Sequence, residues 1–465
     1  MAVRTRFEQS TVSDNDATGQ AQPNAQKAIF TYPPYLLVGP VIQPVSTFPV
    51  AEQNLAQNPK TLATLAGGVS DFSNIHQGRN VTKVFMSEDN GVTWVEGFFP
   101  VDTNGLLPTS DGLAWEANSD PVVAFHQNGA VYVLSLFLNG VSNSLDNSNG
   151  IYVARTTPAN ATAIQPSNII PVQVWSDPNT QFFGDKPWIQ VDNTGKQFDG
   201  HVYVSWTRFF GNDNAVRFSR SVDGGQTYSA PVHLNPLSQN GHIQGTQVQI
   251  GPNGEVYVTW LYTNFGNNSQ LWFIRSLDGG VTWRAPHQIT GNFNTITVNS
   301  TYRVNSFPKM RVSDVDGSIH MLYPDQPTFA LGKQMNYIRS TDGGVTFSNP
   351  ITINDADAGD QFMPNIAIDQ FGHVHACWYD TRNFSLGSQF IDVYASYSKS
   401  PGLWATNVKV NDTPIDLGTA VNNFIGDYSG LRAAAAIDNT VTAHPLWTSA
   451  GFNNGVLLTR ILQVP

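Results

Sequence analysis

The sequence predicts an all-β protein built as a single seven-bladed β-propeller of four-stranded antiparallel blades. Three observations support this prediction. The motif Ser-x-Asp-x-Gly-x-Thr-aromatic occurs four times, its copies recur at about the spacing of one supersecondary unit, and no long stretch of the 465 residues has the period of an amphipathic helix. Sheets repeated around a central axis pack face to face and leave only short, protected edges.

The motif copies set the length of the repeating unit. They read SEDNGVTW at 87 to 94, SVDGGQTY at 221 to 228, SLDGGVTW at 276 to 283 and STDGGVTF at 340 to 347. Asp278 follows Asp223 by 55 residues and precedes Asp342 by 64 residues. Asp89 precedes Asp223 by 134 residues, about two such units. We therefore expect a complete unit without the motif at 119 to 176.

Each unit reads as four short strands, of which the first two are the clearest. Two apolar runs separated by a turn occur seven times. The clearest examples are KPWIQVDNTGKQFDGHVYVSW, TQVQIGPNGEVYVTW, FPKMRVSDVDGSIHMLY, MPNIAIDQFGHVHACWY and DYSGLRAAAAIDNTVTAHPLW, and SDPVVAFHQNGAVYVLSLF is a sixth. Seven units predict seven blades. A six-bladed ring is the alternative if the first unit, AEQNLAQNPKTLATLAGG, is only an appendage.

The last unit runs out of chain after its third strand, GVLLTRILQV. We expect the apolar run at 28–43, AIFTYPPYLLVGPVIQ, to supply the missing outer strand and close the ring. The domain division is then a polar N-terminal arm at 1–27 and one propeller at 28–465.

The charge composition excludes several kinds of partner. The chain carries 24 Lys and Arg against 35 Asp and Glu, a formal net charge of -11, without basic runs. We expect no nucleic-acid surface, because such surfaces need clustered cations, and no membrane insertion, because no segment has the length of a membrane span. The N-terminal stretch lacks the apolar core of a secretory signal, so an extracellular or surface-associated location implies earlier processing or another export route. Cys377 is expected to pack as a small hydrophobic side chain.

The repeated motif has a structural interpretation. Its glycines suit a tight turn with positive φ, and its serine and aspartate side chains are placed to bond nearby backbone amides. We expect it to form the turn between the third and fourth strands, with the aromatic residue anchoring the hairpin. Asp223, Asp278 and Asp342 are therefore not catalytic candidates.

The four motifs resemble the Asp boxes, or bacterial neuraminidase repeats (BNR repeats), of the sialidase superfamily, and the resemblance extends in weaker form from about 50 to 463. It implies a β-propeller. It does not imply one function, because Asp boxes also occur in xyloglucan hydrolases, sorting receptors and assembly factors. Exo-sialidase activity is not expected, because the Phe-or-Tyr-Arg-Ile-Pro motif of sialidases is absent and the nearest look-alike, SFPKM at 306 to 310, has no arginine.

A ligand site is expected on the face opposite the motif turns, where long loops surround the mouth of the central channel. The sialidases that the motifs resemble clamp a sugar carboxylate with three arginines and use a tyrosine, a glutamate and an aspartate in catalysis. The candidate ligand-binding residues on this face are Arg79, Arg208, Arg303, Arg382, Asp120 and Asp185. Of six glutamates, only Glu52 and Glu116 fall where a partner at the channel mouth is expected.

Two short stretches supply the candidate catalytic residues. CWYDTRN ends a second strand with Asp380 and Arg382, and FIGDYSG begins a first strand with Asp427 and Tyr428. Asp380 and Asp427 are the leading pair for glycoside hydrolysis, with Tyr428 and Glu116 as further candidates. The alternative is structural: Asp380 and Arg382 form an ion pair, and the aspartates that precede first strands cap turns.

No cofactor is expected. A ring of carboxylates suits Ca²⁺, but calcium-loop spacing is absent, and His373 and His375 share a strand face without a third zinc ligand in view. The expected function is recognition of a glycan or a similar polar extracellular ligand through the top face, with glycoside hydrolysis as its catalytic version. The alternatives are a non-catalytic lectin-like module and a structural component of a surface complex with a protein partner.

Overall fold

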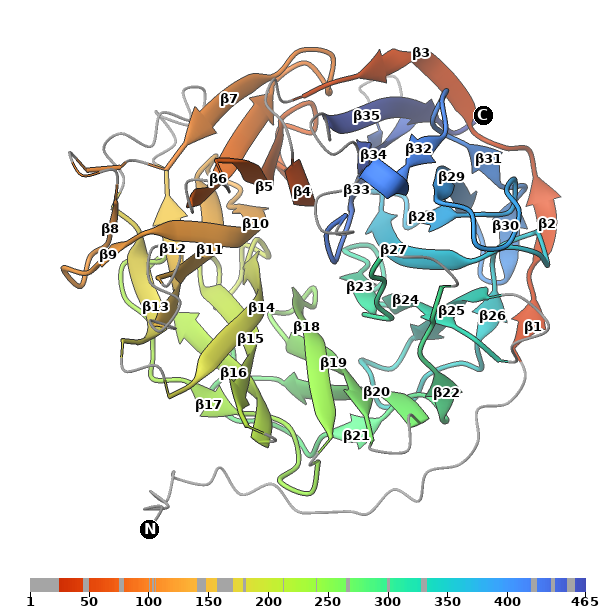
Figure 1. Ribbon diagram of the computed structural model, residues 1–465. Helices are drawn as coiled ribbons and strands as arrows, with labels where there is room; N and C mark the ends of the chain where they lie inside the picture. The colour runs from red at the N-terminus through yellow and green to blue at the C-terminus, as the bar shows by residue number, and fades with distance from the viewer. Residues whose placement is uncertain are drawn as a thin grey trace.

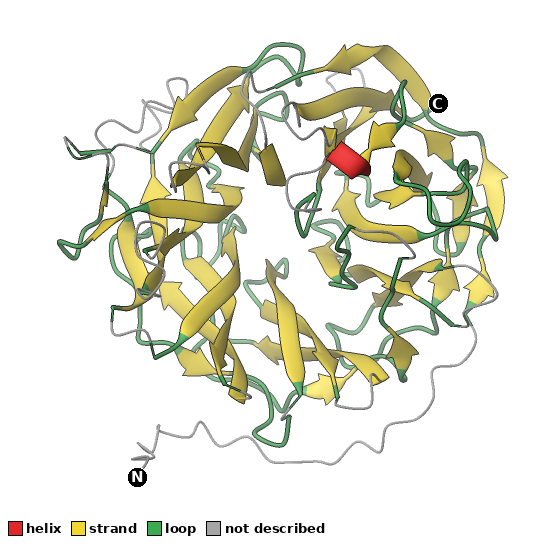
Figure 2. Ribbon diagram, in the orientation of Figure 1, coloured by secondary structure: helices red, strands yellow, loops and turns green. Residues whose placement is uncertain are grey.

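The computed structural model is a ring of seven small sheets around a central axis (Figures 1 and 2). The described residues are 25–44, 50–74, 79–99, 101–102, 104, 106–139, 148–156, 170–178, 181–211, 213–239, 241–264, 268–298, 302–327, 333–419, 425–435, 440–449 and 456–465. Their one helical element is the short 3-10 helix η4 (Leu417–Thr419). None of these residues forms a helix with the length and apolar character needed to cross a membrane.

Each blade is an antiparallel meander whose first strand lies nearest the centre of the ring (Figure 1). Blade 1 contains β4 (Val50–Gln57), β5 (Leu65–Asn74), β6 (Arg79–Ser87) and β7 (Val95–Phe98); blade 2 contains β10 (Ala117–Phe125), β11 (Val131–Leu138), β12 (Asn149–Arg155) and β13 (Val172–Asp177). Blade 3 contains β14 (Phe183–Val191), β15 (Val202–Phe210), β16 (Asp213–Ser221) and β17 (Val232–His233). A small hairpin of β8 (Leu107–Pro108) and β9 (Ala114–Trp115) precedes blade 2.

The remaining blades follow the same plan with small additions. Blade 4 contains β18 (His242–Ile250), β19 (Val256–Thr263), β20 (Asn268–Ser276) and β21 (His287–Gln288), and β22 (Phe293–Asn294) also pairs with β20; blade 5 contains β23 (Lys309–Val312), β24 (Ile319–Asp325), β25 (Gln334–Ser340) and β26 (Ile351–Thr352). Blade 6 contains β27 (Gln361–Ile368), β28 (Val374–Asp380), β29 (Phe390–Ser398) and β31 (Val408–Lys409), with β32 (Ile415–Asp416) beside β29. Blade 7 contains β33 (Gly430–Ala435), β34 (Val441–Ser449) and β35 (Val456–Gln463).

The count of seven blades is confirmed. The interval without the motif, predicted at 119 to 176, forms the complete four-stranded blade 2. The first unit is not an appendage, because β4 packs between β10 of blade 2 and β33 of blade 7. The six-bladed alternative is therefore excluded.

Three N-terminal strands follow the outer edge of the last three blades. β1 (Gln26–Lys27) pairs in parallel with β26, and β2 (Ile29–Tyr32) pairs in parallel with β30 (Leu403–Ala405). β3 (Leu36–Ile42) pairs antiparallel with β35 and is the fourth strand of blade 7. In Figure 1, β3 and β35, from opposite ends of the chain, lie side by side. Of the expected polar arm, residues 1–24 lie outside the described residues, whereas Gln26 and Lys27 form β1.

Tyr35 anchors this N-terminal segment to blade 6. Its side chain is 3% exposed, its ring centroid lies 4.9 Å from that of Tyr397, and its hydroxyl is 2.6 Å from Nδ1 of His375. Nε2 of His375 lies 3.1 Å from Asp369, whose carboxylate also accepts from His373. Because Asp369 accepts the Nε2 proton, Nδ1 is left as the acceptor for the Tyr35 hydroxyl. Hydrogen bonds from both histidines outweigh burial and hold the pKa of Asp369 well below its usual value.

Most core side chains lie between adjacent blades, which explains the nearly continuous apolar strands of the sequence. Each strand inside the ring has a neighbouring blade on both faces, so both sets of alternating side chains are buried. In four blades a tryptophan near the end of the second strand is fully buried, as Trp206, Trp260, Trp378 and Trp447.

The repeated motif forms the turn between the third and fourth strands. In the first copy, Oδ1 of Asp89 accepts the backbone N–H groups of Val92 at 3.0 Å and Thr93 at 2.8 Å, and Oδ2 accepts the Thr93 hydroxyl. The other three copies repeat this pattern. Burial alone would raise the pKa of these carboxyl groups, but the hydrogen bonds outweigh it and lower the pKa of Asp223 to about 2. The carboxylate is thus occupied by its own turn.

Candidate functional site

A repeated irregularity in the innermost strands positions the side chains at the channel mouth. In five blades the pairing of the first two strands shifts register near the start of the first strand. The backbone there has φ of 60° at Glu52, 53° at Asp120, 48° at Lys186, 47° at Met363 and 72° at Gly245. Residues with side chains are strained in this left-handed region, and bulges of this kind turn a side chain away from its regular direction. Because the bulge recurs in successive blades around the ring, the side chains of several bulge residues come together at the channel mouth.

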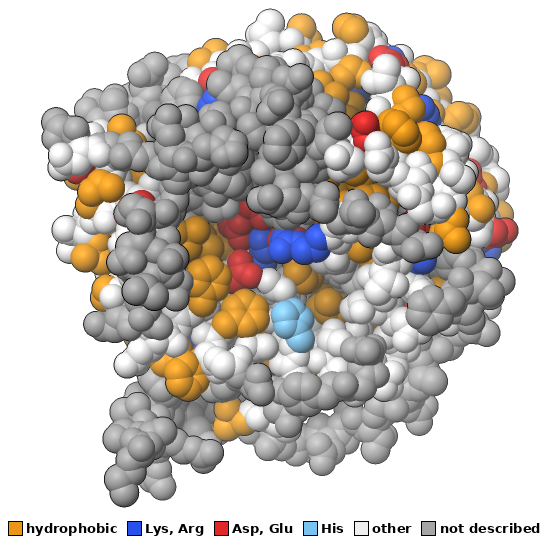
Figure 3. All heavy atoms as spheres, viewed as in Figure 1, with side chains coloured by type: hydrophobic (Ala, Val, Ile, Leu, Met, Phe, Trp, Pro, Cys, Tyr) orange, Lys and Arg blue, Asp and Glu red, His pale blue; other side chains and the backbone are white. Residues whose placement is uncertain are grey.

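Lys186 lies at the centre of a carboxylate cage formed by Glu52, Asp120 and Asp427. Its Nζ is 2.8 Å from Oε1 of Glu52, 3.0 Å from Oδ2 of Asp120 and 2.7 Å from Oδ2 of Asp427. Glu52 is 2% exposed and the two aspartates are each 4% exposed. Acidic and basic side chains also appear together at the hollow centre of the ring in the space-filling view (Figure 3).

Further hydrogen bonds hold the cage. The hydroxyls of Ser70 and Ser119 donate to Oε2 of Glu52 at 3.2 and 3.0 Å. Arg303, from the segment before β23, places Nη2 2.5 Å from Oδ2 of Asp427, and the Asn305 amide donates to Oδ1 of Asp427 at 3.2 Å. The carboxylates of Glu52 and Asp427 therefore have different surroundings: Glu52 contacts two hydroxyls and one cation, whereas Asp427 contacts two cations and an amide.

These surroundings separate the two pKa values. Burial, followed by the negative charge of Asp120, raises the pKa of Glu52 to about 8. Burial would also raise the pKa of Asp427, but the positive charges of Lys186 and Arg303 outweigh it and lower that pKa. The carboxylates in turn outweigh burial at Lys186 and raise its pKa well above the usual value. At neutral pH the cage thus holds a protonated Glu52 and an ionised Asp427.

We expect the pH dependence of unfolding to report the raised pKa of Glu52. Between about pH 4.5 and pH 8 the folded protein keeps a proton on this carboxyl that the unfolded chain has lost. Stability contributed by this residue therefore falls as pH rises through that window. In thermal melts, the Tm of Glu52→Gln relative to that of the wild type should rise as pH increases from 5 to 8. The relative Tm of the exposed control Glu88→Gln should stay constant. A pH-independent difference between Glu52→Gln and the wild type would contradict this pKa.

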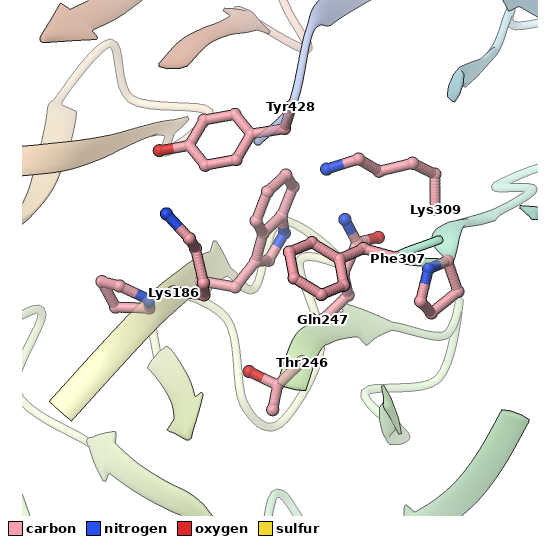
Figure 4. Close-up of a pocket in the computed structure, with 10 residues that line it drawn as sticks. Lys186, Thr246, Gln247, Phe307, Lys309 and Tyr428 are labelled. Carbon is pink, nitrogen blue, oxygen red and sulfur yellow. The ribbon is translucent and has the colours of Figure 1, made fainter. Parts of the chain in front are cut away.

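A pocket opens beside the cage, between the innermost strands of blades 3, 4, 5 and 7 (Figure 4). It has a volume of about 270 Å³, including space open to solvent, and its lining includes Lys186, Trp188, Gln247, Phe307, Lys309 and Tyr428. Nζ of Lys309 lies 4.6 Å from the ring centroid of Trp188 and 5.0 Å from that of Tyr428. The pocket therefore presents flat aromatic rings and two amines within one small space.

Lys309 and Tyr428 are both strongly affected by burial. Burial, followed by the positive charges of Arg311 and Lys186, lowers the pKa of Lys309 to about 7, while the two aromatic faces favour the charged form. Burial raises the pKa of Tyr428 well above 10, and its hydroxyl donates to the carbonyl of Pro121 at 3.3 Å. Tyr428 is thus a neutral pocket wall and not an ionised nucleophile in this arrangement.

Several residues predicted from the sequence meet at the cage. Asp120 and Asp427 belong to it, and Arg303 binds Asp427. Asp185 lies next to it: its Oδ1 accepts the backbone N–H of Lys186, and its Oδ2 accepts from the side chain of Gln244. Burial raises the pKa of Asp185.

Asp380 and Arg382 form a separate clamp inside blade 6. Asp380 is fully buried, and its Oδ2 accepts from the indole of Trp378 at 2.9 Å and from Nη2 of Arg382 at 2.7 Å. Arg382 also binds Asp355, and its guanidinium lies 4.1 Å from the ring centroid of Tyr394. Within the described residues no hydrogen bond or ion pair joins Asp380 to Asp427, so this arrangement matches the structural alternative.

The remaining predicted residues lie outside the cage. Arg208, in β15, is 8% exposed and lies with its guanidinium 4.7 Å from the ring centroid of Phe182. Glu116 precedes β10, where its backbone N–H donates to the Asn139 side chain at 3.1 Å. Arg79 is the first residue of β6, and its side chain is not among those described.

Sequence reasoning missed Lys186, Lys309 and Trp188. It named Asp120 and Asp185 together as candidates, but the bulges show that the residue equivalent to Asp120 in blade 3 is Lys186, which follows Asp185 directly. The available signal was proline, because Pro121, Pro187 and Pro364 each follow the bulge residue.

Among the side chains that the structure describes, no group of three or more histidines, cysteines, aspartates or glutamates is arranged to hold a metal ion. The centre of the carboxylate cage is instead occupied by the Lys186 ammonium. His373 and His375 both bond Asp369, beneath the N-terminal segment.

Comparison with known proteins adds a likeness of fold. No protein-family model and no curated protein sequence matches the chain. A protein of unknown function from Dyadobacter fermentans matches 93% of this chain and 100% of its own, at 14% identity and a TM-score of 0.50. An α-L-arabinanase from Penicillium chrysogenum, complexed with arabinobiose, matches 93% of this chain and 99% of its own, at 11% identity and a TM-score of 0.49. The Hadza microbial sialidase Hz136 matches 89% of this chain and 66% of its own, at 13% identity and a TM-score of 0.42. At these identities the likeness concerns the propeller fold alone.

Proposed function

We propose that the channel mouth binds an extracellular or surface glycan and that the carboxylate cage hydrolyses it, with Glu52 as the proton donor and Asp427 as the ionised carboxylate. The observation that carries this proposal is the separation of two pKa values within one cage: that of Glu52 is raised and that of Asp427 is lowered. Glycoside hydrolases depend on one protonated and one ionised carboxyl group on either side of the bond that breaks.

The spacing of the two carboxyl groups supports a retaining mechanism. Oε1 of Glu52 and Oδ2 of Asp427 both lie within 2.8 Å of Nζ of Lys186, so the two oxygens are at most roughly 5.5 Å apart, the range of retaining enzymes. In this mechanism Asp427 attacks the anomeric carbon while Glu52 protonates the departing oxygen. Water, deprotonated by Glu52, then releases the sugar and restores both groups.

The pocket beside the cage supplies the features that sugar binding needs. The rings of Trp188, Phe307 and Tyr428 line a shallow pocket that is open to solvent, where a sugar ring can stack on a flat face. Gln247, Thr246 and the amine of Lys309 supply polar groups for hydroxyls. Lys186 holds the attacking carboxylate in place.

The test is a panel of chromogenic glycosides together with a glycan array. On a substrate that the wild type cleaves, Glu52→Gln and Asp427→Asn should each lower kcat by at least about 10²-fold, with thermal melts showing that both fold. Asp278→Asn, which weakens one hairpin turn, is the matched control and should leave turnover per folded molecule unchanged. Full activity of both cage variants would contradict the catalytic assignment.

One observation favours a second candidate, a non-catalytic glycan-binding module. Lys186 already engages all three carboxylates of the cage, as a purely structural ion network would. In that case the glycan array gives a hit that depends on Trp188, and no glycoside is cleaved. Trp188→Ala should then abolish binding while Glu52→Gln leaves it intact.

A further inference from the structure

An exposed aromatic surface lies where the innermost strands of blades 3 and 4 begin. We call it the aromatic rim; it consists of Phe183 at the start of β14, Phe209 near the end of β15 and His242 at the start of β18. Phe183 is 38% exposed, His242 is exposed and Phe209 is half-buried. In the space-filling view, hydrophobic side chains and a histidine lie beside the charged centre of the ring (Figure 3). Apolar side chains that gather on a surface in this way commonly mark a binding site.

The three rim side chains lie on the facing sides of the two blades. Phe183 and Phe209 are direct partners in the pairing of β14 with β15, so they lie on the same face of blade 3. The Phe209 ring stacks on the imidazole of His242, with centroids 6.0 Å apart and an interplanar angle of 26°. Two residues farther along β14 and β18, the carboxylate of Asp185 accepts a hydrogen bond from the Gln244 amide. The facing sides thus carry aromatic rings, followed by hydrogen-bonding groups.

The rim leads to the pocket along the same two strands. After Phe183, β14 reaches the pocket at Lys186, and after His242, β18 reaches it at Gly245. Each of these steps is three residues, or roughly 10 Å of extended strand. A glycan with one sugar in the pocket therefore reaches the rim only if it continues as a chain.

The groups along this path suit an uncharged carbohydrate chain. Sugar rings stack on flat aromatic side chains, and their hydroxyls need donors and acceptors beside those rings. Gln244 retains a second amide N–H, and Nδ1 of His242 forms no hydrogen bond within the described residues. The rim and the Asp185–Gln244 pair contain no lysine or arginine, so no cation among them favours an anionic sugar.

We propose that the aromatic rim binds the continuation of a neutral oligosaccharide whose end lies in the pocket, so that the ligand is a chain of several sugars and not a single sugar. The inference rests on the proposed binding of a glycan at the pocket. It does not rest on hydrolysis by the cage, because the rim contains none of the cage carboxylates. Phe183 and His242 are the binding residues for the part of the chain outside the pocket.

Titration of the full chain with neutral oligosaccharides of increasing length tests the proposal. The probes are gluco-, xylo-, manno-, galacto- and arabino-oligosaccharides, each from the monosaccharide to the hexasaccharide, with Glu52→Gln in place of the wild type for any chain that is cleaved. In the series that binds, affinity should rise at least about 10-fold between the monosaccharide and the hexasaccharide. Equal affinity at every length would overturn the proposal.

Variants show whether the gain with length comes from the rim. Phe183→Ala and His242→Ala should each lower the affinity for the hexasaccharide at least about 3-fold and leave that for the monosaccharide unchanged. Phe210→Ala is the matched control, because Phe210 is an exposed phenylalanine one residue after Phe209, on the opposite face of blade 3, where it packs against Phe182. It should keep the wild-type affinity at every length. If both rim variants keep the full gain, the chain extends elsewhere and the proposal is wrong.

These measurements separate failure of this inference from failure of the proposed function. If a monosaccharide binds through Trp188 and longer chains bind no better, the pocket function stands and the rim inference is overturned. If longer chains bind through Phe183 and no glycoside is cleaved, the rim inference stands and hydrolysis by the cage is wrong. If no neutral carbohydrate of any length binds, both are wrong.

Discussion

Replacing Lys186 by methionine is expected to lower the free energy of unfolding by about 3–5 kcal/mol. The Lys186 ammonium is the shared partner of three carboxylates that are at most 4% exposed. Methionine has a similar length but no charge, so the variant leaves these carboxylates buried with Arg303 bound to Asp427 as the remaining ion pair. Denaturant unfolding at neutral pH measures the loss.

Two further variants show whether the loss comes from the cage. Lys196→Met removes an exposed lysine whose Nζ donates to the Asn253 side chain at 2.7 Å, and it should change stability little. Asp120→Asn added to Lys186→Met removes a carboxylate that has lost its partner and should recover part of the loss. If Lys186→Met is as stable as the wild type, the cage is not a buried ion network and the pKa difference between Glu52 and Asp427 has no basis.

Removing residues 1–44 is expected to lower Tm by roughly 10 °C or more. The deletion removes β1, β2 and β3, exposes the edge of β35, and empties the site of the buried Tyr35 ring. Unpaired strand edges and cavities both destabilise a propeller, whose ring is closed by that pairing. Scanning calorimetry at several protein concentrations measures the change and detects association through the new edge.

Smaller changes separate strand pairing from side-chain anchoring. Deletion of residues 1–24 keeps all three strands and serves as the control for chain length. Tyr35→Phe keeps the ring and loses the hydrogen bond to His375, which is expected to lower stability by roughly 1–3 kcal/mol. Unchanged melting after removal of residues 1–44 would show that the N-terminal strands do not hold the ring closed.

The sequence by itself determined the architecture, because the signals for it are local. A turn of the type around Asp278 is specified within eight residues, and its recurrence sets the length of a blade. Paired apolar strands then fill the interval between Asp89 and Asp223 with two blades even though one turn motif is missing there. Only patterns within about 60 residues of chain were needed for the count of seven.

The tertiary structure alone decided which side chains meet at the channel mouth. Glu52, Asp120, Lys186 and Asp427 are far apart in the chain, and ring closure brings blades 1, 2, 3 and 7 around one point. A bulge also inserts one residue into the innermost strand, and a shift of one residue reverses the side of a strand on which a side chain lies. For that reason the pattern pointed to Asp185, whereas Lys186 occupies the centre. The sequence offered an ion pair between Asp380 and Arg382 only as an alternative to catalysis. The structure shows that pair, and it also shows a contact that no local pattern predicts, between Arg382 and Asp355.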